Sequence, residues 1–147
     1  IDSCSFVSCI IARDAVKACG LPVVEFFIWY DDCEYTQRLS RYALGFAITN
    51  SVVTHDMPDN KGVNFTLLNS SNIWKYEYGA RNEAWATYRN KGRLAWLYFM
   101  LRKYKEMKGA GVAFDLKKRI LKACWQAKSV SWEIQSVEKF NYSKYCE

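Results

Sequence analysis

Half of the 147 residues are apolar, which excludes a disordered segment, and the chain is long enough to build one ordinary domain with its own core. The formal net charge is +6, and no apolar run is long enough to span a membrane. Residues 1–74 hold five basic and eight acidic side chains, whereas residues 75–128 hold fourteen basic and four acidic ones. We therefore expect the later part to face an anionic partner, for which nucleic acid, anionic lipid and a diphosphate-linked substrate all qualify.

The six cysteines are even in number and would permit three disulfides, but their spacing is irregular and no two of them form a Cys-x-x-Cys pair. Four of them lie in apolar or periodic stretches, where cysteine behaves as a small hydrophobic residue. We therefore expect a reducing compartment and no structural zinc site. The chain opens without Met and without a signal peptide, so we expect it to begin inside a longer protein or to be a processed product.

The first half of the chain alternates apolar runs with short helical patterns. Residues 5–12 are β-branched and apolar and predict a largely buried strand. Residues 13–19 predict a short helix, which Gly20 closes. The aromatic stretch 23–29 reads as extended chain, and a helical pattern begins at Asp32.

A second apolar run, residues 46–54, predicts another strand, and turn-forming residues make 56–62 a loop. The second half of the chain is helical in pattern. Residues 72–105 predict two amphipathic helices that are broken at residues 90–92, and 110–129 predict a third, basic helix.

This order of elements predicts an α/β fold, with a partial sheet of few strands followed by a helical C-terminal region. Two strands are too few to form a stable sheet alone, so an upstream half or a partner chain is expected to supply the others. The expected division falls between residues 1–70, which carry the strands, and residues 71–147, a basic amphipathic helical tail.

The most informative stretch runs from Phe26 to Tyr35, where aromatic residues surround three carboxylates, Asp31, Asp32 and Glu34. Mutual repulsion and a low local dielectric raise the pKa of at least one such group. A carboxylate of this kind suits a general base that removes a proton from a hydroxyl nucleophile. The alternative is an acidic helix start with a solvated Glu34, which the residues alone favour equally.

His55 is the only histidine, and it follows a predicted strand. With nearby carboxylates it makes an incomplete site for Mn²⁺ or Mg²⁺, although a lone histidine is more often structural. In the basic region, Arg81 could bind a phosphate and Asn82 a sugar hydroxyl. A solvated turn of helix explains the same two residues.

Taken together, these motifs resemble the family 2 glycosyltransferases of the GT-A fold, specifically the bacterial rhamnosyl- and galactofuranosyl-transferase branch. The resemblance covers roughly residues 5–105. The matching residues, in order, are Arg13-Asp14-Ala15-Val16, Gly20-Leu21-Pro22, Phe26 to Leu39, Val52-Val53-Thr54-His55 and Tyr78 to Asn82.

The resemblance implies that residues 1–70 are the C-terminal, acceptor-side half of the catalytic domain. Asp32 would be the catalytic base, with Asp31 beside it and Trp29 as a platform for the acceptor sugar. Glu34, Arg81 and Asn82 would bind substrate, and His55 would hold the divalent metal on the donor diphosphate. The implied reaction inverts the anomeric centre of a nucleotide-sugar, and the metal stabilises the departing charge.

The chain departs from the family because it contains no Asp-x-Asp motif, which in family members belongs to the donor-binding half. We therefore expect the polypeptide to be inactive alone. The expected location is the cytoplasmic face of the cell membrane, where the basic tail would lie on anionic lipid and no specific nucleic acid would be bound. The rival interpretation is a non-enzymatic basic helical module that binds nucleic acid or an anionic membrane surface.

Overall fold

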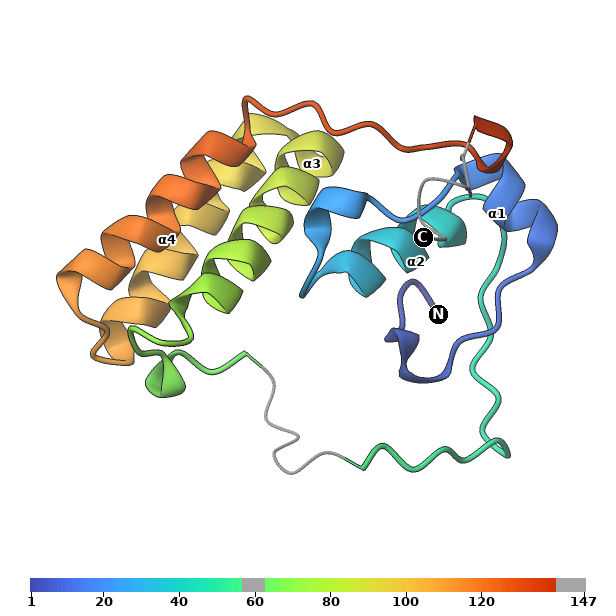
Figure 1. The fold of residues 1–147 in the computed structure, drawn as a ribbon, viewed down its shortest axis with the longest axis horizontal. Coiled ribbons are helices and arrows are strands. Elements are labelled where there is room, and N and C mark those ends of the chain that lie inside the picture. The colour runs from blue at the N-terminus through green and yellow to red at the C-terminus, as the bar shows by residue number, and fades with distance from the viewer. Residues whose placement is uncertain (57–62, 140–147) are drawn as a thin grey trace, which may run out of the picture. The chain divides into compact units, whose positions relative to one another are not determined.

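The computed structural model describes residues 1–56 and 63–139, and within these ranges the chain is helical (Figure 1). The helices are α1 (Arg13–Cys19), α2 (Asp31–Ser40), α3 (Ile73–Gly109) and α4 (Phe114–Ala127). Short 3₁₀ turns are η1 (Phe6–Ser8), η2 (Val24–Phe26), η3 (Phe65–Leu67) and η4 (Val137–Lys139). No strand forms in the described ranges, so the predicted α/β fold class with a partial GT-A-type sheet is wrong.

Both predicted strands lack the neighbours that a ladder requires. In the first, the Ser5 hydroxyl accepts a hydrogen bond from the Val7 amide (3.4 Å), which starts the turn η1 in place of extended chain. In the second, Ile48 and Val52 are 71% and 88% exposed, so no adjacent strand packs on them. Both runs are apolar, but they are largely exposed, and the backbone groups of an isolated strand would have no hydrogen-bond partners.

The described chain divides into two compact units, and each is considered by itself. The terminal unit holds residues 1–25, 31–56 and 132–139. The bundle unit holds the aromatic segment Phe26–Tyr30 together with residues 63–131.

Helix α3 of the bundle unit is bent back on itself at Gly92, which has a left-handed backbone conformation (φ 80°, ψ −177°). The two halves of α3 lie side by side (Figure 1), and Arg102 and Lys103 of the second half each reach Glu83 of the first half at 3.0 Å. Glycine meets this requirement without the steric cost of a Cβ atom. The predicted break at residues 90–92 is confirmed.

The core of the bundle unit lies between the two halves of α3 and α4. It contains the buried side chains of Trp85, Trp96, Phe99 and Ile120. The Trp85 indole nitrogen donates a hydrogen bond to the Val130 carbonyl at 3.0 Å, which ties the chain after α4 to the first half of α3. The apolar spacing therefore predicted the helices of this unit correctly.

In the terminal unit, α1 has the predicted bounds and ends at Gly20 (φ 77°). The Gly20 amide donates to the Val16 carbonyl at 2.8 Å, and the Leu21 amide donates to the Gln135 carbonyl at 2.9 Å. A Cβ atom at Gly20 would lie 2.7 Å from the Gln135 carbonyl oxygen. This glycine is therefore required both by its backbone conformation and by the close approach of the last described segment.

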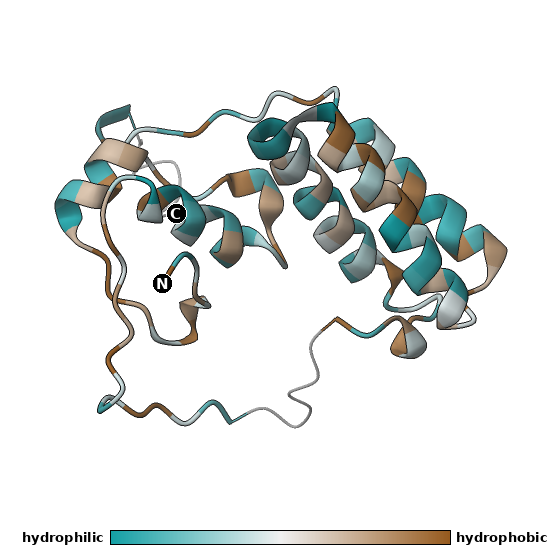
Figure 2. Ribbon diagram, turned by 180° about the vertical axis from the view of Figure 1, so that it is seen from behind, coloured by the Kyte–Doolittle hydropathy of each residue, from teal (hydrophilic) through white to brown (hydrophobic). Residues whose placement is uncertain are grey.

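No helix in the part of the chain that the structure describes is long and apolar enough to cross a membrane. Apolar and hydrophilic residues alternate along α3 and α4 (Figure 2).

Candidate functional site

The aromatic segment Phe26–Tyr30 has an unusual backbone. Phe27, Trp29 and Tyr30 all have positive φ angles, of 51°, 60° and 71°. Each such residue costs on the order of 1–3 kcal/mol when it is not glycine, so surrounding contacts must hold the segment in place. Strained backbone of this kind clusters at functional sites, which makes the segment the first candidate.

Asn82 of α3 supplies those contacts. Its side chain is fully buried, and its amide nitrogen lies 2.8, 3.2 and 2.9 Å from the carbonyl oxygens of Phe26, Ile28 and Trp29. The two amide hydrogens are thus shared among three acceptors. One side chain therefore fixes the backbone across the length of the aromatic segment.

Arg81 orients this amide. Its guanidinium donates to the Asn82 side-chain oxygen from Nε at 3.1 Å and from Nη2 at 2.9 Å, and it lies 4.3 Å from the centre of the Tyr78 ring. With its oxygen engaged by Arg81, the Asn82 amide must turn its nitrogen toward the carbonyls. Arg81 and Asn82 were predicted to bind substrate, and the described contacts give them a positioning role.

The side chains of the aromatic segment pack on the first half of α3. The Trp29 ring meets the Tyr76 ring edge to face at 5.1 Å, and Phe27 lies 5.8 Å from Tyr78. A Cβ atom at Gly79 would approach the Trp29 ring to 2.8 Å. Gly79 thus leaves the room in which the indole ring sits.

A cleft of about 70 Å³ opens beside Trp29, within the bundle unit. The ion pair between Glu83 and Lys103 forms its polar wall, with 3.0 Å between Lys103 Nζ and Glu83 Oε2. The Tyr76 hydroxyl donates to the Asn64 carbonyl at 2.7 Å, and burial raises the pKa of this phenol. The lining residues are Trp29, Tyr30, Val63, Phe65, Tyr76, Gly79, Ala80, Glu83 and Lys103.

Of the residues that line the cleft, the sequence pointed to Trp29 alone as a sugar-binding residue. Glu83 and Lys103 lie on either side of the break at Gly92, so a hairpin at that break would have brought them together. Gly79 inside a helical pattern was the second available signal, because such a glycine often marks a close approach.

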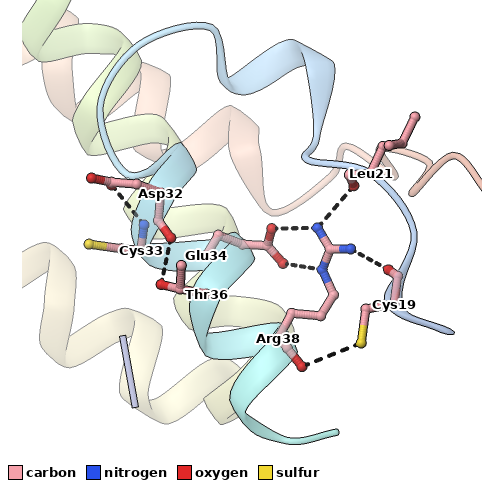
Figure 3. Close-up of polar contacts among 7 residues, drawn as sticks. All are labelled: Cys19, Leu21, Asp32, Cys33, Glu34, Thr36 and Arg38. Atoms are coloured by element: carbon pink, nitrogen blue, oxygen red, sulfur yellow. Dashed lines mark hydrogen bonds and ion pairs between the residues drawn. The ribbon is translucent and has the colours of Figure 1, made fainter. Parts of the chain in front are cut away.

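Asp31 and Asp32 form the first turn of α2 and directly follow Tyr30 in the chain. Both side chains are half-buried. One carboxylate oxygen of Asp32 accepts a hydrogen bond from the Cys33 amide at 2.7 Å (Figure 3). Acidic residues are common in the first turn of a helix, where the amide groups carry a partial positive charge.

Glu34 points in another direction, into a buried ion pair with Arg38 (Figure 3). Its two oxygens accept from Arg38 Nε at 3.0 Å and Nη2 at 2.9 Å. The same guanidinium donates to the carbonyls of Cys19 and Leu21, which links α2 to the end of α1. Both oxygens of Glu34 are therefore engaged inside the terminal unit, and its contact with substrate stays a prediction.

His55 is exposed and lies in the irregular chain of the terminal unit. Among residues 1–56 and 63–139, no group of three or more His, Cys, Asp or Glu side chains could hold a metal ion. His55 thus offers one imidazole nitrogen, and the described residues do not complete a metal site around it. Most of the predicted loop 56–62 lies outside the described residues.

No family model matches the chain, and no curated protein and no solved structure matches it. The resemblance to family 2 glycosyltransferases therefore rests on the residues quoted for it.

Proposed function

We propose that this chain is the catalytic and acceptor-side part of an inverting, metal-dependent glycosyltransferase of cell-surface polysaccharide synthesis. One observation carries the proposal: the Asn82 amide holds three carbonyls of the aromatic segment that leads directly into Asp31 and Asp32. Two of the motifs that carry the resemblance, Phe26 to Leu39 and Tyr78 to Asn82, lie some fifty residues apart and contact each other through this side chain. A motif pair that serves one site is expected to behave in this way.

The cleft supports the acceptor side of the proposal. Aromatic rings from Trp29, Phe65 and Tyr76 line it, and the ion pair of Glu83 with Lys103 adds charged groups that hydroxyl groups can hydrogen-bond. Sugars combine apolar ring faces with hydroxyl edges, so a site for them pairs aromatic surface with a few polar groups. A volume of about 70 Å³ suits part of one sugar ring, with the rest of the glycan outside.

In the proposed reaction, the Asp32 carboxylate removes the proton from the acceptor hydroxyl. The resulting oxygen attacks the anomeric carbon of the donor from the face opposite the nucleoside diphosphate. The new C–O bond forms as the bond to the diphosphate breaks, and the electron pair leaves with the diphosphate. Asp31 lies beside the base and helps to shape its surroundings.

The donor side of the proposal depends on residues outside this chain. His55 would contribute one ligand to the Mn²⁺ or Mg²⁺ ion, which neutralises the donor diphosphate when it is bound. The other ligands would come from the donor itself and from an Asp-x-Asp motif on an upstream half or partner chain, because this sequence contains none. The proposed location is the cytoplasmic face of the cell membrane, where lipid-linked glycan acceptors would be presented.

The ion pairs of the bundle unit weigh against the rival nucleic-acid module. Arg102 and Lys103 are held by Glu83 and Glu106, and Arg119 by Glu77. Part of the positive charge that suggested a phosphate-binding surface thus serves pairing within the unit.

The acceptor role can be tested by saturation-transfer NMR with methyl α-rhamnoside and methyl β-galactofuranoside on the full chain. We expect one of the two glycosides to receive saturation from aromatic protons. Gly79→Ala, which pushes a methyl group against Trp29, and Phe65→Ala should each abolish the effect. Their matched controls are Gly109→Ala, at a glycine with open space around it, and Phe6→Ala in the terminal unit. Saturation transfer that survives both cleft variants, or that never occurs, would overturn the acceptor role.

A further inference from the structure

The second half of α3 is apolar on two opposite faces. Trp96, Phe99 and Met107 are buried against the rest of the bundle unit, at 1%, 3% and 0% exposure. On the other face, Leu94, Tyr98 and Leu101 are 83%, 69% and 63% exposed. At 100° per residue, this spacing places the second set directly opposite the first.

This exposed stripe is large for the surface of a small protein. Leu97 flanks it at 40% exposure, so three leucines and a tyrosine lie together on about two turns of one helix. A surface helix normally turns charged residues to water on this side. Contiguous apolar surface of this kind marks an interaction site.

Positive charge surrounds the stripe. Lys91 and Arg93 precede it, and Lys105 and Lys108 continue it along the same face, and all four side chains are exposed. The only carboxylate between residues 91 and 109 is Glu106, which binds Arg102 and Lys103 at 3.2 and 3.5 Å. The face therefore presents leucine and tyrosine between basic ends, with no acidic side chain of its own.

We propose that this face, Leu94, Leu97, Tyr98 and Leu101 with Lys91, Arg93, Lys105 and Lys108, docks on an anionic lipid bilayer. The helix would lie in the plane of the interface, with its leucines among the acyl chains and its basic ends at the phosphate headgroups. Tyrosine is well suited to the boundary between them. This surface would bring the proposed cleft to a lipid-linked acceptor, whereas membrane binding itself depends on the composition of this face and not on the proposed function.

A second copy of the chain fits this face less well than a membrane does. Pairing two such stripes in an antiparallel orientation would bring Arg93 of one copy toward Lys108 of the other. A parallel pair would align each basic residue with its own copy. Both arrangements oppose like charges at both ends of an apolar seam, whereas anionic headgroups neutralise them.

The test is flotation of the full chain with vesicles of phosphatidylglycerol and phosphatidylcholine, compared with phosphatidylcholine alone. We expect binding to the anionic vesicles at low salt and little binding to the neutral ones. Leu94→Ser with Leu101→Ser should weaken binding by about a hundredfold, since each buried leucine side chain contributes about a factor of ten. Lys105→Glu with Lys108→Glu should weaken it by about thirtyfold or more.

The matched control is Leu44→Ser with Ile48→Ser, since these residues of the terminal unit are as exposed as the stripe, at 82% and 71%. The control pair should float like the unchanged chain, and circular dichroism should show that all variants keep their helix content. The proposal is overturned if the unchanged chain does not float with anionic vesicles, or if the stripe variants float as it does. It is also overturned if light scattering shows a dimer that Leu94→Ser with Leu101→Ser converts to a monomer. None of these outcomes depends on sugar binding, so failure here leaves the proposed glycosyltransferase role to its own test.

Discussion

Replacing Asn82 by alanine removes a buried side chain of α3 that donates to three carbonyls of the aromatic segment. The carbonyls of Ile28 and Trp29 lose their donor, whereas the carbonyl of Phe26 keeps the hydrogen bond from the Ile28 amide. The bond to Phe26 is buried and the other two are partly buried, so water can replace only some of what is lost. With about 1–3 kcal/mol for each unsatisfied buried acceptor, we expect the free energy of unfolding to fall by about 3 kcal/mol.

The measurement is urea unfolding followed by circular dichroism, with tryptophan fluorescence as a second probe. Asn82→Asp should cost more than Asn82→Ala at neutral pH, because it turns a carboxylate oxygen toward the same carbonyls. The control is Asn50→Ala, at an exposed asparagine of the terminal unit, which should change stability by less than about 1 kcal/mol. A loss below about 1 kcal/mol for Asn82→Ala, or equal losses for the two asparagines, would refute the role assigned to Asn82.

Three further predictions concern the bend in α3, a buried thiol and a buried ion pair. Gly92→Ala should lower the melting temperature, because φ is 80° there and a Cβ atom costs about 1 kcal/mol in this conformation. Gly109→Ala, within the last turn of α3, should leave the melting temperature unchanged. Equal effects of the two variants would refute the bend. Burial raises the pKa of Cys124 to about 12, so iodoacetamide at pH 8 should label it only in urea, and labelling of the folded chain at the same rate would contradict its burial. Arg38→Met leaves Glu34 buried without its partner and should lower the free energy of unfolding by about 3–5 kcal/mol. Adding Glu34→Gln should recover part of this loss. A double variant no more stable than Arg38→Met would contradict the role of the ion pair.

The helices could be predicted from the sequence because their signals are local. The apolar spacing, the glycine after α1 and the Asn-Lys-Gly break before residue 93 each act within a few residues, and the structure confirms them. The strands could not, because a strand is stable only beside another one, and the apolar runs at residues 5–12 and 46–54 find no neighbour in the described chain. Apolar, β-branched composition is a condition for a strand and does not supply its partners.

The candidate site also has a part that local sequence patterns predict and a part that depends on long-range contacts. The carboxylates after Tyr30 are recognisable because three acidic residues among aromatic ones form a local pattern. The contact between Asn82 and Phe26 joins residues 56 positions apart, and no local sequence pattern near either residue predicts it. The ion pair of Glu83 with Lys103 also required knowing that α3 turns back at Gly92.

The proposed glycosyltransferase role is tested most directly by sugar transfer with the full-length product of the gene. The assay would follow transfer from dTDP-rhamnose and UDP-galactofuranose to a lipid-linked glycan in the presence of Mn²⁺. The account predicts that Asp32→Asn abolishes transfer while donor binding stays nearly unchanged. Asp115→Asn, an exposed aspartate in the first turn of α4, should leave transfer intact. Near-native turnover by Asp32→Asn, or no transfer from either donor by the unchanged protein, would contradict it.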